Sequence, residues 1–356
     1  MNVRQKISVI ILAHNKPEMT WRCLEALAPA LADFDHEVIL RDNGSTENVD
    51  FPYDCAEMFQ NYKFIRGKEN LSFSIANNIH AREATGDVLL FLNNDVFCRP
   101  DTVRNLLQPL INNTGVGCTG GKLLFPGEKS VQSAGVIQTL WGYLFGYALG
   151  AAPDDERVQN KCERFALTGA MLCVPGEIFH QVGGFDERYF WGYEDVDFCL
   201  KIRAAGKKTL YCPSAVAIHD ESATRKTVRS TEIDEHNYRI YRQTWDSFLV
   251  PAEQRFINDL KGRGVRRVVV FGMGTAARHL SKILDVNGIE IAAYTASDVN
   301  EPNEFLNRPV IPLTRLDQTR YDRVMIASQY FFEIEPIIRK YDLLRAPIWP
   351  LINSVV

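Results

Sequence analysis

Apolar residues follow two alternating patterns along the first hundred positions of the chain. Continuous apolar runs of strand length occur in "KISVIILA" (6–13), "HEVILRD" (36–42) and "GDVLLFLNN" (86–94). Between these runs, apolar residues three and four positions apart predict helices over residues 18–32 and 72–85. Strands that alternate with helices predict a parallel sheet with helices on both faces.

The rest of the chain divides into a less regular part and a second alternating part. Apolar residues have helical spacing within 194–205, and a helix-rich stretch follows from about residue 233. A strand, a glycine turn and a helix then occur in "RRVVVFGMGTAARHLSKIL" (266–284). We therefore expect an α/β domain over residues 1–232, a helical linker over 233–262 and a smaller Rossmann-like α/β domain over 263–356.

Composition restricts the class of protein and of partner. The 356 residues are 46% hydrophobic and 24% charged, with a formal net charge of −4. These values are typical of a soluble globular protein and give no sign of a nucleic-acid partner. The eight cysteines form no CxxC motif, so we expect reduced thiols in the cytoplasm rather than a zinc site or disulfides.

No segment predicts a membrane span or a secretory signal. The N-terminal apolar run is short and fits a first strand. The stretch "LWGYLFGYALGAA" (140–152) is aromatic and apolar, but it is shorter than the roughly 18 residues a span needs. We expect it to pack in a core or line a cleft, and we expect peripheral membrane contact at most.

Four polar clusters follow predicted strands or open a predicted helix. They are "AHN" (13–15), "RDNGS" (41–45), "NND" (93–95) and "GYEDVD" (192–197). The first three should meet at one edge of a parallel sheet, where ligands bind in open α/β folds. Each alone also fits a plain turn. Together they predict a nucleotide pocket with a base site, a phosphate and metal site, and a carboxylate pair.

At this level of detail the chain resembles a family 2 glycosyltransferase, an inverting enzyme of the GT-A fold. The resemblance implies a Rossmann-like mixed sheet flanked by helices. The resemblance covers about residues 6–222. It rests on "SVIILAHNK", "DNGS", "ENLSFSIANN", "ATGDVLLFLNND", "LYCPSAVAIHDES" and the long segment from "LTGAML" to "KIRAAG", in this order. The form of the third cluster is similar to that of bacterial surface-polysaccharide enzymes, including rhamnosyltransferases.

The resemblance implies a role for each matching residue. The donor nucleotide sugar is bound by residues of the first three clusters and the intervening helix: Ala13, Asn15, Asp42, Asn70, Asn77, Asn94 and Asp95. Asp95 and His219 hold a divalent metal, Mn²⁺ or Mg²⁺. Asp195 is the catalytic base, with Glu194 beside it, and the acceptor site is shaped by Gly184, Asp186 and Trp191.

Several of these residues could instead have a purely structural role. Asp195 could cap the helix that begins near Val196, and His219 could be an ordinary strand-end histidine. Asp186 could be a turn residue, and Trp191 could belong to the core. Asn93 also stands where the family often has an acidic residue, which bears on the strength of metal binding.

The second α/β pattern carries a GxGxxA spacing at Gly272, Gly274 and Ala277, between a strand and a helix. This is the context of a dinucleotide fingerprint. The next strand offers only Asp298 as an acidic partner for a ribose, and it lies late. A structural or homo-oligomerisation role and a nucleotide-binding role both remain open.

We interpret the chain as an inverting glycosyltransferase that moves a sugar from a nucleoside diphosphate to a hydroxyl of a growing surface glycan, such as an O-antigen or capsule. The acceptor would be a glycan or lipid-linked glycan at the inner face of the plasma membrane. The alternatives are an NAD-dependent oxidoreductase acting through the C-terminal domain, and a sugar-nucleotide or glycan-binding protein without catalysis.

Overall fold

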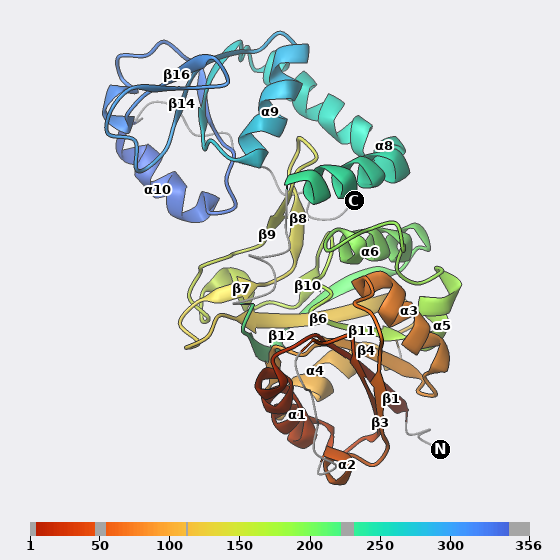
Figure 1. Ribbon diagram of the computed structural model, residues 1–356. Coiled ribbons are helices and arrows are strands. Elements are labelled where there is room, and N and C mark those ends of the chain that lie inside the picture. The colour runs from red at the N-terminus through yellow and green to blue at the C-terminus, as the bar shows by residue number, and fades with distance from the viewer. Residues whose placement is uncertain (1–4, 47–54, 112, 222–230, 342–356) are drawn as a thin grey trace. The chain divides into compact units, whose positions relative to one another are not determined.

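The computed structural model describes residues 5–46, 55–111, 113–221 and 231–341 (Figure 1). Contacts divide the chain into two compact units. Unit 1 consists of Met1–Val136 and Leu149–Thr244, and unit 2 consists of Ile137–Ala148 and Trp245–Ser354 as far as these ranges are described.

Unit 1 is built on a mixed sheet with the strand order β10-β12-β6-β11-β4-β1-β2-β3. The strands of this order are β1 (Lys6–Ala13), β2 (Asp35–Asp42), β3 (Tyr62–Arg66), β4 (Val88–Asn93), β6 (Val116–Leu124), β10 (Cys162–Glu163), β11 (Met171–Pro175) and β12 (Lys208–His219). The first four are parallel, whereas β11 runs antiparallel to β4 and β6. Two short strands join from the side, β5 (Val96–Cys98) on β12 and β7 (Val131–Ser133) on β6.

Helices cover both faces of this sheet. They are α1 (Pro17–Leu31), α2 (Cys55–Met58), α3 (Phe73–Glu83), α4 (Thr102–Leu107), α5 (Gly176–Gln181), α6 (Glu194–Ala204) and the 3-10 turn η1 (Glu156–Val158). The helix α3 begins after Ser72, whose side chain accepts a hydrogen bond from Ile75 N, the usual way to satisfy a free amide at a helix start.

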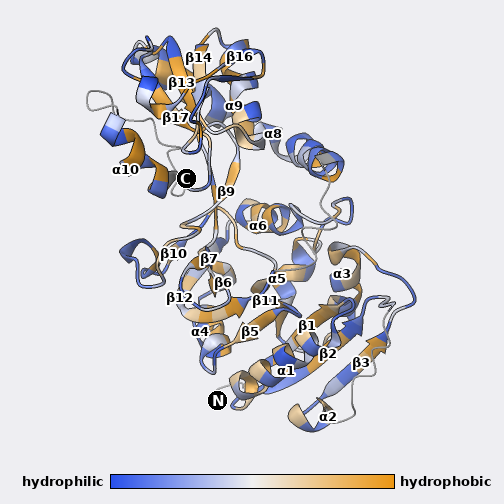
Figure 2. Ribbon diagram, turned by 60° about the vertical axis from the view of Figure 1, so that its left-hand side comes forward, coloured by the Kyte–Doolittle hydropathy of each residue, from blue (hydrophilic) through white to orange (hydrophobic). Residues whose placement is uncertain are grey.

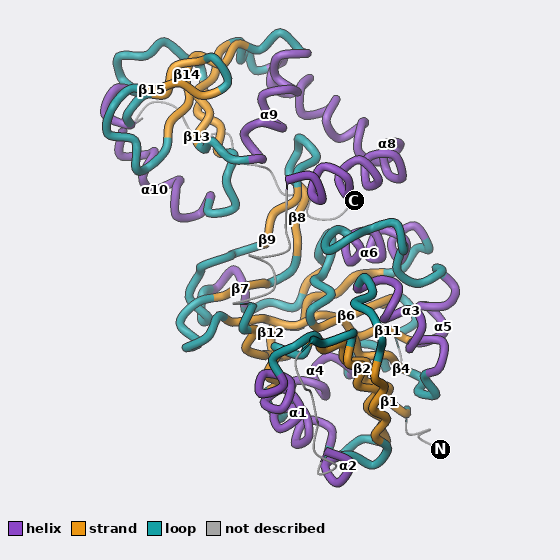
Figure 3. Tube along the Cα trace, viewed as in Figure 1, coloured by secondary structure: helices purple, strands orange, loops and turns teal. Residues whose placement is uncertain are grey.

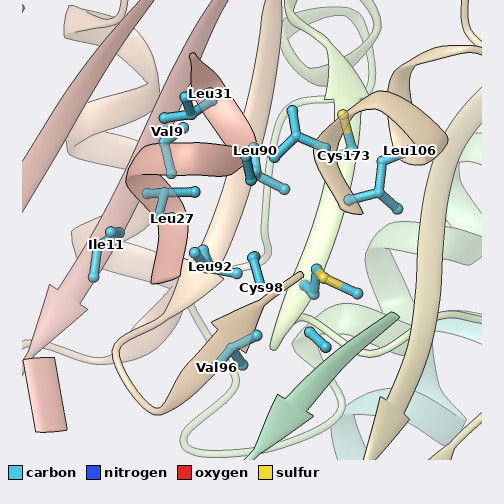
Figure 4. Close-up of a cluster of buried hydrophobic side chains, with 14 of the residues drawn as sticks. Val9, Ile11, Leu27, Leu31, Leu90, Leu92, Val96, Cys98, Leu106 and Cys173 are labelled. Atoms are coloured by element: carbon cyan, nitrogen blue, oxygen red, sulfur yellow. The ribbon is translucent and has the colours of Figure 1, made fainter. Parts of the chain in front are cut away.

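The run "LLFL" shows how the sequence builds these layers. Leu90 and Leu92 point to one face, where they join the core with Leu27 of α1 and Leu106 of α4 (Figure 4). Phe91 points to the other face, and its ring lies 5.0 Å from that of Phe179 in α5. Because alternate side chains of a strand face opposite ways, an unbroken apolar run fits a strand buried on both sides. Burial of each such side chain stabilises the fold by about 1.5–3 kcal/mol.

Unit 2 contains a five-stranded sheet with the order β15-β16-β14-β13-β17 (Figure 3). Its elements are β13 (Arg267–Phe271), α9 (Thr275–Val286), β14 (Glu290–Thr295), β15 (Asn303–Phe305), β16 (Arg308–Val310), η2 (Leu313–Arg315), β17 (Arg323–Ile326) and α10 (Phe331–Tyr341). The central strand β13 is hydrophobic and buried from Val268 to Phe271 and pairs in parallel with both β14 and β17 (Figure 2). The second alternating pattern of the sequence thus forms a smaller α/β unit.

A hairpin from an earlier part of the sequence completes the core of unit 2. It consists of β8 (Val136–Gln138) and β9 (Leu144–Gly146). Trp141 at its tip is fully buried, and its ring lies 6.0 Å from that of Phe256. The aromatic stretch at 140–152 therefore contributes to a core, one of the two places expected from the sequence.

The stretch expected as a helical linker, residues 233–262, lies within one long helix, α8 (Thr231–Gly262). Its residues up to Thr244 belong to unit 1, and those from Trp245 onward belong to unit 2. Residues Phe256, Ile257 and Leu260 lie in the core of unit 2. The stretch expected as a linker is thus a continuous helix that contributes to both units.

Across the described part of the chain, the helices are too short or too polar to cross a membrane. All eight cysteines are free, and seven of them are buried. Burial raises the pKa of the Cys98 thiol to about 12, so this thiol stays protonated and is a packing group rather than a nucleophile.

Candidate active site

The turns after β1 and β2 are joined at one edge of the sheet. Asn15 and Lys16 both adopt a left-handed conformation, with φ of 56° and 52°. The amide of Asn15 donates to Ser45 Oγ at 2.7 Å, and its side-chain oxygen accepts from Thr46 N at 2.9 Å. The AHN and DNGS clusters therefore form one surface, as the parallel order of the strands predicts.

Asp42 lies beneath this surface and is 1% exposed. One carboxylate oxygen accepts from Ser45 N at 3.0 Å, and the other lies 3.3 Å from Arg66 Nε. Gly44 has a φ of 76°, and a side chain there would collide with the backbone of Glu69. The turn consequently requires glycine, and its close approach brings the loop before α3 to the same edge.

That loop is held by Asn43, which lies between Asp42 and Gly44. Its side-chain nitrogen donates to Asn70 Oδ1 and to Leu71 O, both at 2.8 Å. Asn70 therefore lies at the site. Asn77 is placed differently, because it is buried on α3 and its side-chain nitrogen donates to Phe73 O of the same helix at 3.0 Å.

The third cluster meets the end of β12. After Asn94 and Asp95 the chain enters β5, where Val96 pairs with His219. This pairing brings Asp95 Oδ1 to 3.2 Å from His219 Nε2. Both atoms are buried and neither forms a hydrogen bond. Asn94 faces α1, and its side-chain nitrogen donates to Thr20 Oγ1 at 2.9 Å.

His219 is oriented by Gln132, a residue on β7. The ring atom Nδ1 lies 2.5 Å from Gln132 Oε1, and the Gln132 amide donates to His219 O at 3.2 Å. Because an amide oxygen only accepts, Nδ1 carries the proton in this contact. In the neutral ring Nε2 then presents its lone pair toward Asp95.

This pair fits a divalent cation. A carboxylate oxygen and an imidazole nitrogen, both buried and without hydrogen bonds, are the donor types that Mn²⁺ accepts. Within the described residues, no cluster of three or more acidic, histidine or cysteine side chains could hold a metal. Two protein ligands are nevertheless sufficient where the ion keeps water and binds substrate phosphates.

Glu194 and Asp195 begin α6. The amide of Gly169 donates to Asp195 Oδ2 at 3.0 Å, and Val196 N donates to Asp195 Oδ1 at 2.8 Å. Glu194 Oε2 accepts from Gly192 N at 2.7 Å. The N-cap position is Tyr193, so Asp195 is not the N-cap residue, although it accepts from the first-turn amide of Val196. Its carboxylate lies inside the first turn instead.

The segment around Gly169 connects Asp195 to the third cluster. Gly169 donates to Asp195, and the next residue, Ala170, accepts a hydrogen bond at its carbonyl oxygen from Asn93 N at 2.9 Å. A side chain at position 169 would lie 3.1 Å from the ring of Phe73, so the approach is tight. Two consecutive residues thus bring the ends of β4 and α6 together.

The loop before α6 contains the three residues predicted for the acceptor. Gly184 has a φ of 67° and Trp191 a φ of 58°, and Trp191 is half-buried rather than part of the core. Asp186 accepts hydrogen bonds from the backbone and guanidinium of Arg188. Burial alone would raise the pKa of Asp186, but these bonds outweigh it and lower the pKa. Asp186 therefore stabilises the turn that contains Arg188.

The sequence pointed to most of this edge and missed several supporting residues. The sequence patterns give no role to Gln132, Gly169 or Arg66, although Gly169 lies in the "LTGAML" motif. Gln132 carries no local signal, because its contact with His219 joins positions 87 residues apart.

Known protein families match both units. The family described as "Glycosyl transferase family 2" matches residues 8–167, and the one described as "N-terminal domain of galactosyltransferase" matches residues 156–224. A third family, "C2185-like, N-terminal", matches residues 264–344.

Relatives and a solved structure agree with the first match. The O-antigen biosynthesis protein RfbC of Myxococcus xanthus is 27% identical over 71% of this chain, which spans only 20% of that protein. The N-acetylglucosaminyl-diphospho-decaprenol L-rhamnosyltransferase of Mycobacterium tuberculosis (strain H37Rv) is also 27% identical, over 57% of this chain and 73% of the relative. The crystal structure of GalNAc-T7 with UDP, GalNAc and Mn²⁺ has a TM-score of 0.55 at 16% identity, covering 82% of this chain and 56% of that one.

The chain therefore contains a family 2 glycosyltransferase domain with the GT-A fold. This confirms the family and the fold that the sequence motifs predicted.

Proposed function

We propose that the chain transfers a sugar from a nucleoside-diphosphate donor to a hydroxyl of a growing bacterial surface glycan, with inversion at the anomeric carbon. The observation that carries this proposal is the contact between two buried atoms, Asp95 Oδ1 and His219 Nε2, at the sheet edge that also carries the DNGS turn. The names of the two relatives, an O-antigen biosynthesis protein and a rhamnosyltransferase, support the class of product.

The donor would be held by the joined turns. Ala13, Asn15 and Asp42 would bind the nucleotide base, and Asn70 and Asn94 would line the rest of the donor pocket. Asn77 is buried on α3 and would act only by supporting that helix. Asp95 and His219 would hold Mn²⁺ or Mg²⁺, which when bound neutralises negative charge on the departing diphosphate. Gln132 keeps the His219 ring in the orientation that this contact needs.

Asp195 would act as the general base. The acceptor hydroxyl gives its proton to the carboxylate as its oxygen bonds to the anomeric carbon. The bond from that carbon to the diphosphate oxygen breaks, and its electron pair leaves with the nucleoside diphosphate. The amides of Gly169 and Val196 hold the Asp195 carboxylate in place. A single in-line displacement inverts the configuration.

The acceptor would bind against the loop that contains Gly184, Asp186 and Trp191, with Glu194 beside the base. We place the reaction at the cytoplasmic face of the membrane, on a lipid-linked glycan. The free, buried cysteines fit a reducing compartment.

Thermal unfolding in the presence of nucleotides tests the donor site. UDP, TDP and GDP are each added with and without Mn²⁺ to the wild type, to Asp95→Asn and to the control Asp101→Asn on an exposed turn. A ligand that binds the folded state raises the melting temperature by mass action. We expect a Mn²⁺-dependent rise with one nucleoside diphosphate in the wild type and the control, and its loss in Asp95→Asn. An equal rise in Asp95→Asn would rule out the proposed metal role.

A further inference from the structure

Two buried asparagines hold the acceptor loop, one at each end. Asn78 of α3 accepts from Phe185 N at 3.0 Å and donates to Phe185 O at 2.8 Å. Asn237 of α8 makes the same pair of contacts with Phe190: it accepts from the amide at 3.0 Å and donates to the carbonyl at 2.7 Å. Each carboxamide thus satisfies both the backbone N–H and the backbone C=O of one loop residue, as a neighbouring strand would in a sheet.

The loop needs such a restraint because of the residues that follow Phe190. Trp191, Gly192 and Tyr193 have φ values of 58°, 133° and 73°, so three consecutive residues lie in a region that side chains disfavour. Strained backbone of this kind persists only where the surrounding structure fixes it. The next two residues are Glu194 and Asp195, so the strained turn determines how the carboxylate pair enters the site.

Asn237 is well placed to provide this restraint. It is 0% exposed. The neighbouring ring of Tyr241 lies 5.4 Å from that of Tyr193, on the far side of the strained turn. One turn further along α8, Thr244 Oγ1 accepts from Arg188 at 3.2 Å. Asn237 also lies outside the residues that the two glycosyltransferase families match, 8–167 and 156–224.

We propose that Asn237 is a positioning residue for the acceptor side of the active site, supplied by a helix beyond the family-matched region. Its carboxamide fixes Phe190, and thereby the turn that delivers Glu194 and Asp195. It does not touch the donor site. The proposal rests on the proposed function for its catalytic consequence, whereas its structural step stands on the contacts alone.

Asn237→Asp tests the structural step with little change of shape. The variant loses the amide donor and places a carboxylate against the Phe190 carbonyl. Amide hydrogen exchange is followed in a peptide covering 186–194 and in one covering β6, which is buried along its whole length. We expect exchange in the first peptide to accelerate about tenfold, the size expected for one lost hydrogen bond, with β6 unchanged. The matched control is Asn105→Asp, whose side chain binds Ser214 O away from the loop.

Unchanged exchange over 186–194 would overturn the proposal. An equal acceleration in β6 would also overturn it, because Asn237 would then support only general stability. If Asn237→Asp does not fold, Asn237→Ser, which keeps a donor and an acceptor, is measured in the same way.

The catalytic consequence is tested by a sugar-transfer assay. The donor in this assay is a nucleotide sugar that contains the nucleoside diphosphate found to bind in the thermal assay. At saturating donor we expect kcat to fall about tenfold with the donor KM unchanged, because the base is displaced and the donor site is not. A raised donor KM with an unchanged kcat would overturn the positioning role. Should UDP, TDP and GDP all fail to bind the wild type, the proposed function fails, while the exchange experiment still decides whether Asn237 holds the loop.

Discussion

Both units contain a parallel strand that ends in a tight turn and leads into a helix, yet the two turns differ in what surrounds them. After β1 the turn meets the ends of β2 and β4, and two buried atoms nearby, Asp95 Oδ1 and His219 Nε2, form no hydrogen bond. After β13 the turn contains Gly272, whose φ is 115° and where a side chain would lie 2.8 Å from Ala327 O. This glycine serves close packing against the end of β17.

The polar groups at the neighbouring strand end of unit 2 are used within the fold. Thr295 Oγ1 at the end of β14 donates to Ile311 O at 2.8 Å, and Tyr294 OH lies 2.6 Å from Ser281 Oγ. Asp298, the only acidic candidate for a ribose contact in the sequence, is exposed beyond the strand. A strand, a glycine turn and a helix therefore do not make a site by themselves. In unit 1, by contrast, Asp95 Oδ1 and His219 Nε2 face each other at the end of the sheet without a hydrogen bond.

The largest expected effect on activity comes from replacing Asp195, the proposed catalytic base in unit 1. Asp195→Asn removes the proton acceptor but keeps the shape, so kcat for sugar transfer should fall by about 10²–10⁴-fold. Binding of the nucleoside diphosphate should persist in the thermal assay. The matched control in unit 2 is Asp298→Asn, which should leave kcat unchanged. An equal loss of kcat in Asp195→Asn and Asp298→Asn would contradict the assignment of the active site to unit 1.

The next largest effect concerns stability. Trp141→Ala empties part of the core of unit 2 and should destabilise that unit by about 3–5 kcal/mol. Calorimetry should show a lower unfolding temperature for one transition. The half-buried Trp191 offers a comparison, since Trp191→Ala should cost less. If Trp141→Ala unfolds no earlier than Trp191→Ala, the hairpin is not part of the core as described.

A smaller effect tests the cation site. Gln132→Met keeps the side-chain length but removes the acceptor for His219 Nδ1, so the affinity for Mn²⁺ in the presence of the bound nucleoside diphosphate should fall about 10–100-fold. Titration calorimetry measures this. Gln159→Met is the control, because the Gln159 side chain donates to Pro153 O and Asp155 O and accepts from Lys122 Nζ, and does not contact His219 in these bonds. An unchanged affinity in Gln132→Met would show that the ring needs no such partner.

The smallest expected effect concerns the turn of unit 2. We expect NAD⁺ to leave the melting temperature of the wild type unchanged, because Thr295 occupies the strand end where a ribose partner would be needed. A rise with NAD⁺ that disappears in Gly274→Asp would instead establish a dinucleotide site in unit 2.

Much of the local structure could be predicted from the sequence. The run "KISVIILA" forms β1 with the same bounds, and the helix expected over 194–205 is α6, Glu194–Ala204. Apolar periodicity determines these elements because each buries a defined face. The glycosyltransferase family with the GT-A fold could also be predicted, because its motifs occur in the family's order along the chain.

The supporting contacts could not be predicted in this way. Asn237 and Phe190 lie 47 positions apart, and their contact depends on where α8 packs. The apolar character of 140–152 indicated burial but not that a hairpin from the middle of the first domain would enter the second core. Likewise, no local sequence pattern signals the three positive φ values at Trp191, Gly192 and Tyr193 that precede α6.

The hairpin has a consequence for synthesis of the chain. Trp141 leaves the ribosome about 115 residues before Phe256, its partner in the core of unit 2. At translation rates of about 5–20 residues per second, this aromatic tip waits roughly 6–23 seconds without the surface that buries it. The nascent chain therefore exposes an apolar segment after most of the first sheet has emerged, and a chaperone that shields it during this interval would protect the whole protein from aggregation.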